Sequence, residues 1–521
     1  MSKKQNNLFS TLGSDLPASI VVFLVALPLC LGIALASGAP LFSGIVAGVV
    51  GGIVAGAFSK SHLSVSGPAA GLVVIVLNAI ETLGTFEAFL LAVVLSGVIQ
   101  IIMGFLKAGI IGMFFPSSVI KGMLAAIGLI LILKQIPHLI GFDLDAFGEM
   151  EFIQLDGSNT FSYLLESFSH VEPGSLIVGV ISFIMILSWN HPVIKRNSIT
   201  RQIPGGLIAV VAGVLINELF KAYIPSLTIY DTHLVSLPVL EEGESYASML
   251  RFPEFNQLGN PQLYVTAFTL AIIASLETLL SIEAIDKLDP LKRRTPQNVE
   301  LKAQGIGNIV SGLIGGLPIT AVIVRSTANL DAGAKSKLSA ILHGIILMSA
   351  VLFFPIIMNM IPLATLAAIL IIIGYKLTKP ALYRYHFKLG KEQFYPFLIT
   401  VLAILFTDLL IGIIIGLAIG VFFILRSNYK IPYHYLEKEG AEGQLDTITI
   451  QLSEHVTFLN KASLQLTLEE IPEHKQVVID GSYTSDIHHD ALEVIHNYKA
   501  SAKEKGILCE LINVPDLASG K

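Results

Sequence analysis

Residues 265–285 read VTAFTLAIIASLETLLSIEAI, a largely apolar run with the carboxylate Glu277 near its middle. About 20 apolar residues suffice for a helix that crosses a lipid bilayer, so this run predicts a membrane-spanning helix. A charged side chain at bilayer depth costs roughly 2.5–3.5 kcal/mol on insertion scales, and carboxylates there usually face a cavity, a partner or a transported ion. We therefore predict that Glu277 is functional; the alternative is a structural carboxylate that a neighbouring helix neutralises.

The composition of the whole chain agrees with a membrane protein. Residues of the AVILMFWYC set make up 53% of the chain and charged residues only 14%, whereas a soluble domain carries about 25% charged residues. The net charge of −6 indicates no nucleic-acid partner, and two cysteines, Cys30 and Cys509, predict no disulfide framework. The first apolar run, residues 18–36, is followed directly by another, which favours a spanning helix over a signal peptide.

Motifs of the common enzyme classes are missing from the sequence. Gly305 and Gly307 begin a pattern similar to a dinucleotide fingerprint, but Val310 stands where the third glycine belongs, and no strand is expected before it. P-loop, His-Glu-x-x-His and Cys-x-x-Cys spacings do not occur. We therefore predict that the protein is not an enzyme and uses no metal or cofactor.

The apolar segments number fourteen and fall into two sets of seven. The third and the tenth are both too short to span a bilayer alone, and they occupy the same place in each set. Interrupted segments at matching places predict an inverted repeat with the functional site at its interface. The segments are residues 18–37, 43–58, 67–79, 85–106, 109–133, 175–189, 204–220, 263–285, 303–316, 320–330, 338–361, 363–375, 395–409 and 410–425.

The loops between these segments differ in charge. Residues 140–173 contain seven acidic and no basic residues, and residues 222–263 are also mostly acidic. Basic residues gather instead in residues 195–201, 287–294 and 376–391. Because basic loops stay in the cytoplasm, we predict a multi-pass protein of the cell membrane with both termini cytoplasmic.

The two short segments share a pattern that favours anion binding. Residues 61–78 read SHLSVSGPAAGLVVIVLN and residues 315–329 read GGLPITAVIVRSTAN; in each, β-prone residues and a turn precede an apolar helix. A helix N-terminus carries about half a positive charge, so two such termini facing each other would form an anion site. Ser66 and Thr320 would add hydroxyl donors and Arg325 a fixed charge. The alternatives are helix capping by the two hydroxyls and a structural ion pair for Arg325.

Five stretches together make the chain similar to a known family. From about Leu16 to the C-terminus it resembles the sulfate permease (SulP) anion transporters, and the stretches that carry the resemblance are VALPLCLGIALASG (25–38), SVSGPAAG (64–71), SLETLLSIEAID (275–286), ELKAQGIGNIVSGLIGGLP (300–318) and VRSTANLDAGAKSKLS (324–339). The resemblance implies an α-helical polytopic membrane protein with 14 segments in a 7+7 inverted repeat, a core domain that moves against a gate domain, a homodimer, and a small cytoplasmic α/β STAS domain.

The C-terminal part of the chain fits that implication on its own pattern. β-Prone runs at 447–452, 476–479 and 507–512 alternate with helical patterns at 461–468 and 490–505. Residues 454–472 resemble the start of a STAS domain, which looks abbreviated here. In residues 480–491, where some STAS domains are phosphorylated, His488 and His489 replace the usual acidic-then-Ser pair, so we expect no phosphorylation switch and interpret both histidines as surface residues. The predicted domains are 1–15 (cytoplasmic segment), 16–428 (transmembrane domain), 429–446 (linker) and 447–521 (STAS domain).

The resemblance also implies a substrate site and an ion-coupling residue. Glu277 occupies the coupling position; relatives with Asp there resemble sodium-coupled bicarbonate carriers, so Glu implies proton coupling, with Na⁺ as the alternative. Many sulfate carriers have Gln after the proline of the first helix, where this chain has Pro28-Leu29, which removes a polar contact. The implied substrate-binding residues are Ser66, Gly67, Pro68, Ala69, Ser281, Thr320, Ala321 and Arg325.

We therefore predict a secondary active transporter of a small inorganic anion of the sulfate or bicarbonate class, proton-coupled and working by alternating access. Its expected partners are the anion, a co-transported proton, the lipid bilayer and a second copy of the chain. The alternatives are a small dicarboxylate/H⁺ symporter, a passive anion channel, a nucleobase permease of the same fold, and a membrane-anchored signalling protein that works through its STAS domain.

Overall fold

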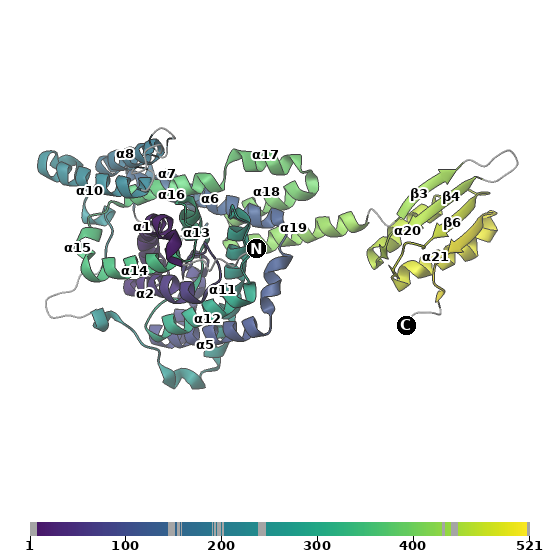
Figure 1. Cartoon of the computed structure of the whole chain (residues 1–521), viewed down its shortest axis with the longest axis horizontal. Coiled ribbons are helices and arrows are strands. Elements are labelled where there is room, and N and C mark those ends of the chain that lie inside the picture. The colour runs from purple at the N-terminus through teal and green to yellow at the C-terminus, as the bar shows by residue number, and fades with distance from the viewer. Residues whose placement is uncertain are drawn as a thin grey trace. The chain divides into compact units, whose positions relative to one another are not determined.

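The computed structural model describes residues 8–143, 152–153, 157, 159–189, 191, 194, 200, 203–237, 246–429, 433–438 and 446–517. The chain forms two compact units, Met1–Leu417 and Ala418–Lys521; Figure 1 shows the first as a bundle of helices and the second as a sheet with helices. Lys195, Arg196 and Arg201, which contribute to the predicted orientation, lie outside the described residues.

Each of the fourteen predicted segments contains a helix in the described part of the chain. Among the described residues, eight helices are long and apolar enough to cross a membrane. The first set of seven comprises α1 (Leu12–Ala36), α2 (Leu41–Val50) continued through a π-helical turn (Gly51–Ala55) into α3 (Gly56–Phe58), α4 (Val73–Leu83), α5 (Phe86–Phe105), α6 (Ser117–Ile140), α8 (Pro173–Trp189) and α10 (Gly205–Tyr223). The second comprises α11 (Pro261–Leu288), α12 (Gln297–Leu313), α13 (Ile323–Asp331), α14 (Leu338–Phe353), α16 (Leu363–Leu377), α18 (Lys391–Phe406) and α19 (Leu409–Tyr429).

In two of the predicted segments, a proline sets a helix end that differs from the prediction. The segment predicted at 109–133 starts as a 3-10 helix (Ala108–Phe114), and α6 begins only after Pro116 and continues to Ile140. The segment predicted at 338–361 ends at Phe353, and Pro355 begins the separate short helix α15 (Pro355–Met358). Proline has no N–H to continue a helix, so it is placed at a helix start. Two further short helices, α7 (Thr160–Ser167) and α17 (Pro380–Lys388), lie between the long ones.

The helices of the first unit pack into two bundles, and each bundle contains helices from both sets of seven. In the core bundle, α5 packs against α11 and α12, and α1 packs against α2, α13 and α14; Figure 1 shows α5, α11 and α12 side by side. In the gate bundle, α6 packs against α16 and α18, and α8 against α10 and α16. Each bundle thus takes the same members from both sets of seven, which is the arrangement expected of an inverted repeat.

Pairs of glycines allow close helix contacts in each bundle. A Cβ added to Gly97 of α5 would lie 2.5 Å from the carbonyl oxygen of Gly305 in α12, and the reverse distance is 2.6 Å. In the gate bundle, a Cβ added to Gly128 of α6 would lie 2.6 Å from the carbonyl oxygen of Gly374 in α16, and the reverse distance is 2.7 Å. Small residues at such crossings let helix backbones touch, so the two bundles are fixed internally.

The C-terminal unit is a small α/β domain, as predicted. Its sheet has the order β3 (Tyr433–Lys438), β4 (Thr447–Leu452), β6 (Gln476–Asp480) and β8 (Leu508–Ile512), with β3 antiparallel to β4 and the other pairs parallel. Helices α20 (Lys461–Glu469) and α21 (His489–Ala502) contribute to its apolar core. β3 lies within residues 429–446, which were expected to form a linker. His488 and His489 are both exposed.

Candidate functional site

Two short strands bring the starts of α4 and α13 together inside the core bundle. β1 (Ser66–Pro68) pairs antiparallel with β2 (Ile319–Ala321), so that Gly67 lies opposite Thr320. After β1 a 3-10 turn (Ala70–Leu72) leads into α4, and after β2 the helix α13 begins at Ile323. Because the strands are antiparallel, the two helices run in opposite directions from one place, and their positive N-terminal ends converge there.

Polar side chains of α12 hold the two strands in place. Asn308 accepts a hydrogen bond from the N–H of Ile319 (2.6 Å) and donates one to its carbonyl oxygen (3.1 Å). One turn earlier, Gln304 donates to the hydroxyl of Ser66 (2.6 Å). All four residues are buried, and hydrogen bonds to buried backbone groups are expensive to lose. The strands therefore form a rigid floor to the site.

Arg325 lies one turn into α13 and is completely buried. Its Nη2 donates weakly to Sγ of Cys30 (3.3 Å) and to the carbonyl oxygen of Pro68 (3.5 Å), whereas Nε and Nη1 have no acceptor among the described residues. Gly67 makes room for the guanidinium, since a Cβ there would lie 2.9 Å from Cζ. A buried guanidinium with spare donors, beside two helix N-termini, suits an anionic ligand.

Glu277 and Ser281 lie together on one face of α11. They line a cavity of about 20 Å³ with Gly71 and Leu409, and a Cβ added to Gly71 would lie 3.2 Å from Oε1 of Glu277. The carboxylate is thus placed against the start of α4. Its Oε2 has no hydrogen-bond partner in the described part of the chain. The described residues also include no cation that forms an ion pair with Glu277.

The structure gives the remaining predicted site residues different surroundings. The Ser66 hydroxyl is turned toward Gln304, and Thr320 is fully buried with its hydroxyl 3.5 Å from the carbonyl oxygen of Ala321. Neither residue caps a helix: the positions before the two helical segments are Ala69 and Val322. Thus Gly67, Pro68 and Arg325 meet at one place, whereas the hydroxyl of Ser66 points toward α12 in the core bundle.

Two residues of the gate bundle face Arg325, and the sequence analysis did not select them. Lys134 and Gln135 of α6 line a cavity of about 30 Å³ together with Arg325 and Ala70. A larger cavity of about 260 Å³ shares Ala70 with it and extends toward Asp408. The signal in the sequence was a lysine within an apolar run, GLILILKQIPHLI (128–140), but the predicted segment ended at residue 133.

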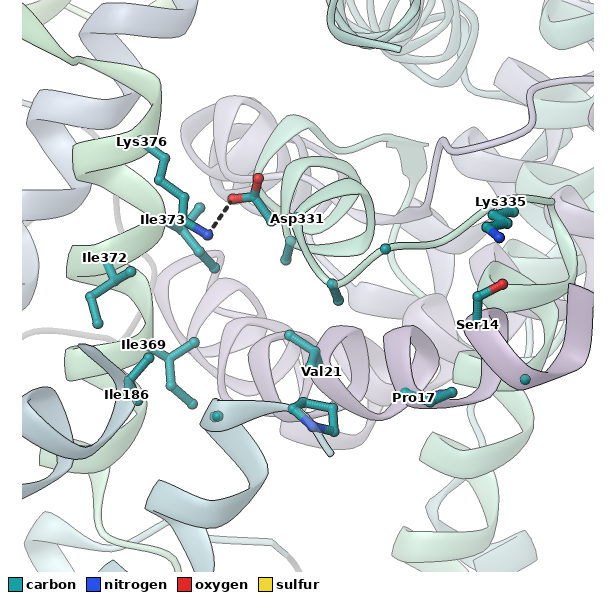
Figure 2. A pocket seen from close by; sticks show the side chains of 17 residues that line it. Ser14, Pro17, Val21, Ile186, Asp331, Lys335, Ile369, Ile372, Ile373 and Lys376 are labelled. Atoms are coloured by element: carbon teal, nitrogen blue, oxygen red, sulfur yellow. Dashed lines mark ion pairs between the residues drawn. The ribbon is translucent and has the colours of Figure 1, made fainter. Parts of the chain in front are cut away.

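A fourth cavity, of about 530 Å³, lies between the bundles near the end of α13 (Figure 2). Pro17 and Val21 of α1 form one wall and Ile369 of α16 faces them. An ion pair of 3.2 Å between Asp331 of α13 and Lys376 of α16 crosses from one bundle to the other. The cavity of about 530 Å³ thus lies near the end of α13, whereas the cavity of about 260 Å³ lies beside the start of α4.

Comparison with known proteins relates the chain to a family of anion transporters. The sequence profile of the Sulfate permease family matches residues 12–403. A putative sulfate transporter, YvdB of Bacillus subtilis, is 27% identical over 430 residues, which are 81% of this chain and 76% of the relative. The bicarbonate transporter BicA of Picosynechococcus is 26% identical over 377 residues, 70% of this chain and 62% of the relative.

Solved structures share the fold. The transmembrane domain of a cyanobacterial bicarbonate transporter BicA covers 79% of this chain and 98% of its own, with a TM-score of 0.52 and 24% identity. The structure of the murine anion transporter Slc26a9 in its inward-facing state matches 100% of this chain and 88% of its own chain, with a TM-score of 0.67 and 16% identity. At these identities the likeness concerns the fold of the chain.

Proposed function

Because the chain belongs to the sulfate permease family, we propose that it is a secondary active transporter of a small inorganic anion. The observation that carries the proposal is the buried guanidinium of Arg325, whose Nε and Nη1 have no acceptor among the described residues and which lies beside two converging helix N-termini. The C-terminal α/β unit fits a STAS domain. Relatives named as sulfate and bicarbonate transporters support both anions as substrates.

The place of the site supports the proposal of alternating access. Arg325 belongs to the core bundle and faces the gate bundle, with a cavity of about 530 Å³ near the end of α13 and one of about 260 Å³ beside the start of α4. Movement of the core bundle against the gate bundle would open one cavity and close the other around a fixed site. The ion pair between Asp331 and Lys376 would break or re-form in this movement, since its partners belong to different bundles.

We assign proton coupling to Glu277. Its carboxylate lies against the 3-10 turn that leads into α4, close to the place where the anion would bind, and has no paired cation in the part of the chain that the structure describes. A carboxylate and an anion repel each other unless the carboxyl carries a proton. Anion and proton would therefore bind together and leave together, which is symport. Sodium in place of the proton remains the alternative coupling ion.

The test is uptake of radiolabelled sulfate and bicarbonate into proteoliposomes with an inward proton gradient, compared with an inward sodium gradient. Glu277→Gln should abolish uptake driven by the proton gradient while leaving counterflow exchange. The matched control is Glu283→Gln on the same helix, because Glu283 is half-buried and paired with Lys287 (3.4 Å) outside the site. Proton-driven uptake that is unchanged in Glu277→Gln would contradict the assignment.

The chain is also proposed to work as a homodimer in the cell membrane with both termini in the cytoplasm. The basic stretches 287–294 and 376–391 support this orientation through the preference of basic loops for the cytoplasm. Labelling of single cysteines introduced at Lys292 and at Tyr230, both exposed, by an impermeant reagent would test it: only the cysteine at Tyr230 should react from outside the cell.

A further inference from the structure

Helix α17 is a short amphipathic helix that connects α16 and α18 of the gate bundle. It begins at Pro380, which separates it from α16 because proline cannot continue a helix. Leu382 and Tyr383 pack against the apolar core, and the ring of His386 is stacked on that of Phe397 in α18, with 4.3 Å between the ring centres. One side of α17 is thus fixed to the gate bundle.

The opposite side of α17 is exposed and strongly basic. Residues 376–391 contain five lysine or arginine residues and no acidic residue. One of the five, Lys376, is paired with Asp331. The other four are exposed: Lys379, Arg384, Lys388 and Lys391. In the part of the chain that the structure describes, no acidic side chain forms an ion pair with any of these four, so their positive charge is available to a partner outside the chain.

Exposed aromatic side chains flank these basic residues. Phe387 and Tyr385 leave 69% and 50% of their surfaces exposed. At 3.6 residues per turn, Arg384 and Lys388 lie along one line of the helix, with Tyr385 on one side of that line and Phe387 on the other. Lys121 of α6, whose amine lies over the ring of Tyr385 (4.9 Å), adds a further positive charge. Basic residues beside exposed aromatic rings are typical of a helix that lies in the interface between lipid and water.

We propose that this side of α17 binds the anionic headgroups of phospholipids in the leaflet beside it. Charges are costly to bury at bilayer depth, so α17 lies at the end of α16, level with the headgroups, where lysine and arginine reach the phosphate groups. In the proposed orientation of the chain this is the cytoplasmic leaflet. Because α17 packs against α18 and joins it to α16, bound lipid would hold the gate bundle at a fixed depth. Lipid binding needs no transported anion, so it is tested independently of the proposed transport.

The test reads the lipids beside α17 by fluorescence quenching in the full-length protein. The chain has a single tryptophan, Trp189, so Phe387→Trp in a Trp189→Phe background places one fluorophore on the exposed side of α17. This reporter protein is reconstituted into mixed vesicles of phosphatidylglycerol and phosphatidylcholine, in which one or the other lipid carries bromine on its acyl chains. Comparison of the two quenching curves gives the preference for the anionic lipid at α17.

The expected size of the preference follows from the number of cations. Each basic side chain beside an anionic surface contributes roughly fivefold in affinity. The reporter protein should therefore prefer phosphatidylglycerol by at least about tenfold, and less strongly at high salt, which screens exposed charges. Adding Arg384→Gln, Lys388→Gln and Lys391→Gln should reduce the preference to less than about threefold.

The charge-matched control instead adds Lys499→Gln, Lys503→Gln and Lys505→Gln, at three exposed positions of the C-terminal domain, and should keep the full preference. Equal quenching by both lipids in the reporter protein, or an unchanged preference after the three substitutions at 384–391, would overturn the proposal. Absence of quenching by either lipid would also overturn it and would leave the basic surface to a soluble acidic partner. Loss of the preference on adding soluble glycerol phosphate would show a site for the free phosphate group in place of the lipid, and would overturn it too.

Discussion

Replacing Gly67 by alanine should damage the anion site without touching any charged residue. A Cβ at this position would lie 2.9 Å from Cζ of Arg325 and still closer to Nη1, whereas carbon atoms pack at about 3.5–4.0 Å. Strand β1 cannot shift easily, because it is paired with β2 and because Gln304 donates a hydrogen bond to the hydroxyl of Ser66. The guanidinium must therefore move, by roughly 1 Å.

The size of the effect follows from what the guanidinium would lose. A charge-assisted hydrogen bond contributes roughly 1.5–3 kcal/mol, so its loss should raise the Kd for the anion by about tenfold to 150-fold. Protein stability should change less than affinity, because the displaced group lies next to a cavity. Isothermal titration calorimetry with sulfate and a thermal-melting measurement on the same samples would separate the two effects.

Two controls make the result specific. Gly259→Ala adds a methyl group where no atom lies within 4 Å, so this variant should bind like wild type. In an Arg325→Ala background, Gly67→Ala should lower affinity little further, because both changes act on the same group and such effects are not additive. Wild-type affinity in Gly67→Ala alone would refute the idea that the guanidinium holds the anion.

Three further predictions concern stability and domain roles. The hydrogen bond to Asp143 (2.6 Å) raises the pKa of His233 above its usual range, so the stability from this pair is complete below about pH 6.5 and is lost as the pH rises through the raised pKa. In Asp143→Asn the melting temperature should therefore depend less on pH above about 6.5 than it does in the wild type. Asn308→Ala should destabilise the protein by roughly 2–4 kcal/mol, measured by denaturant unfolding, because it leaves the buried N–H and carbonyl groups of Ile319 unpaired. Truncation after Tyr429 should leave equilibrium anion binding near normal in monodisperse protein, and lost binding with a folded membrane unit would show that the C-terminal domain shapes the site.

Sequence alone predicted the class of protein and the order of its helices. Apolar runs of sufficient length form helices in a bilayer whatever their neighbours, because the backbone must satisfy its own hydrogen bonds there. Because a helix needs a minimum length to span the bilayer, the two short segments at matching places predicted the inverted repeat without knowledge of the packing. The alternating strands and helices after residue 446 were equally readable, since the period of an apolar pattern is a local property. Strand β3 was not predicted, because most side chains of its residues, Tyr433–Lys438, are exposed.

The site itself depended on tertiary structure. Sequence pointed to Glu277 and Arg325, because a charge within an apolar run is conspicuous, but only the packing shows that they line separate cavities with no ion pair between them in the described chain. The hydroxyl of Ser66 was expected to face the anion, and Gln304, 238 residues away, turns it into the core bundle. Lys134 became visible as a site residue only when α6 lay opposite α13. The direction in which a buried polar side chain points is decided by which partner can satisfy it, and in this fold those partners come from the other half of the chain.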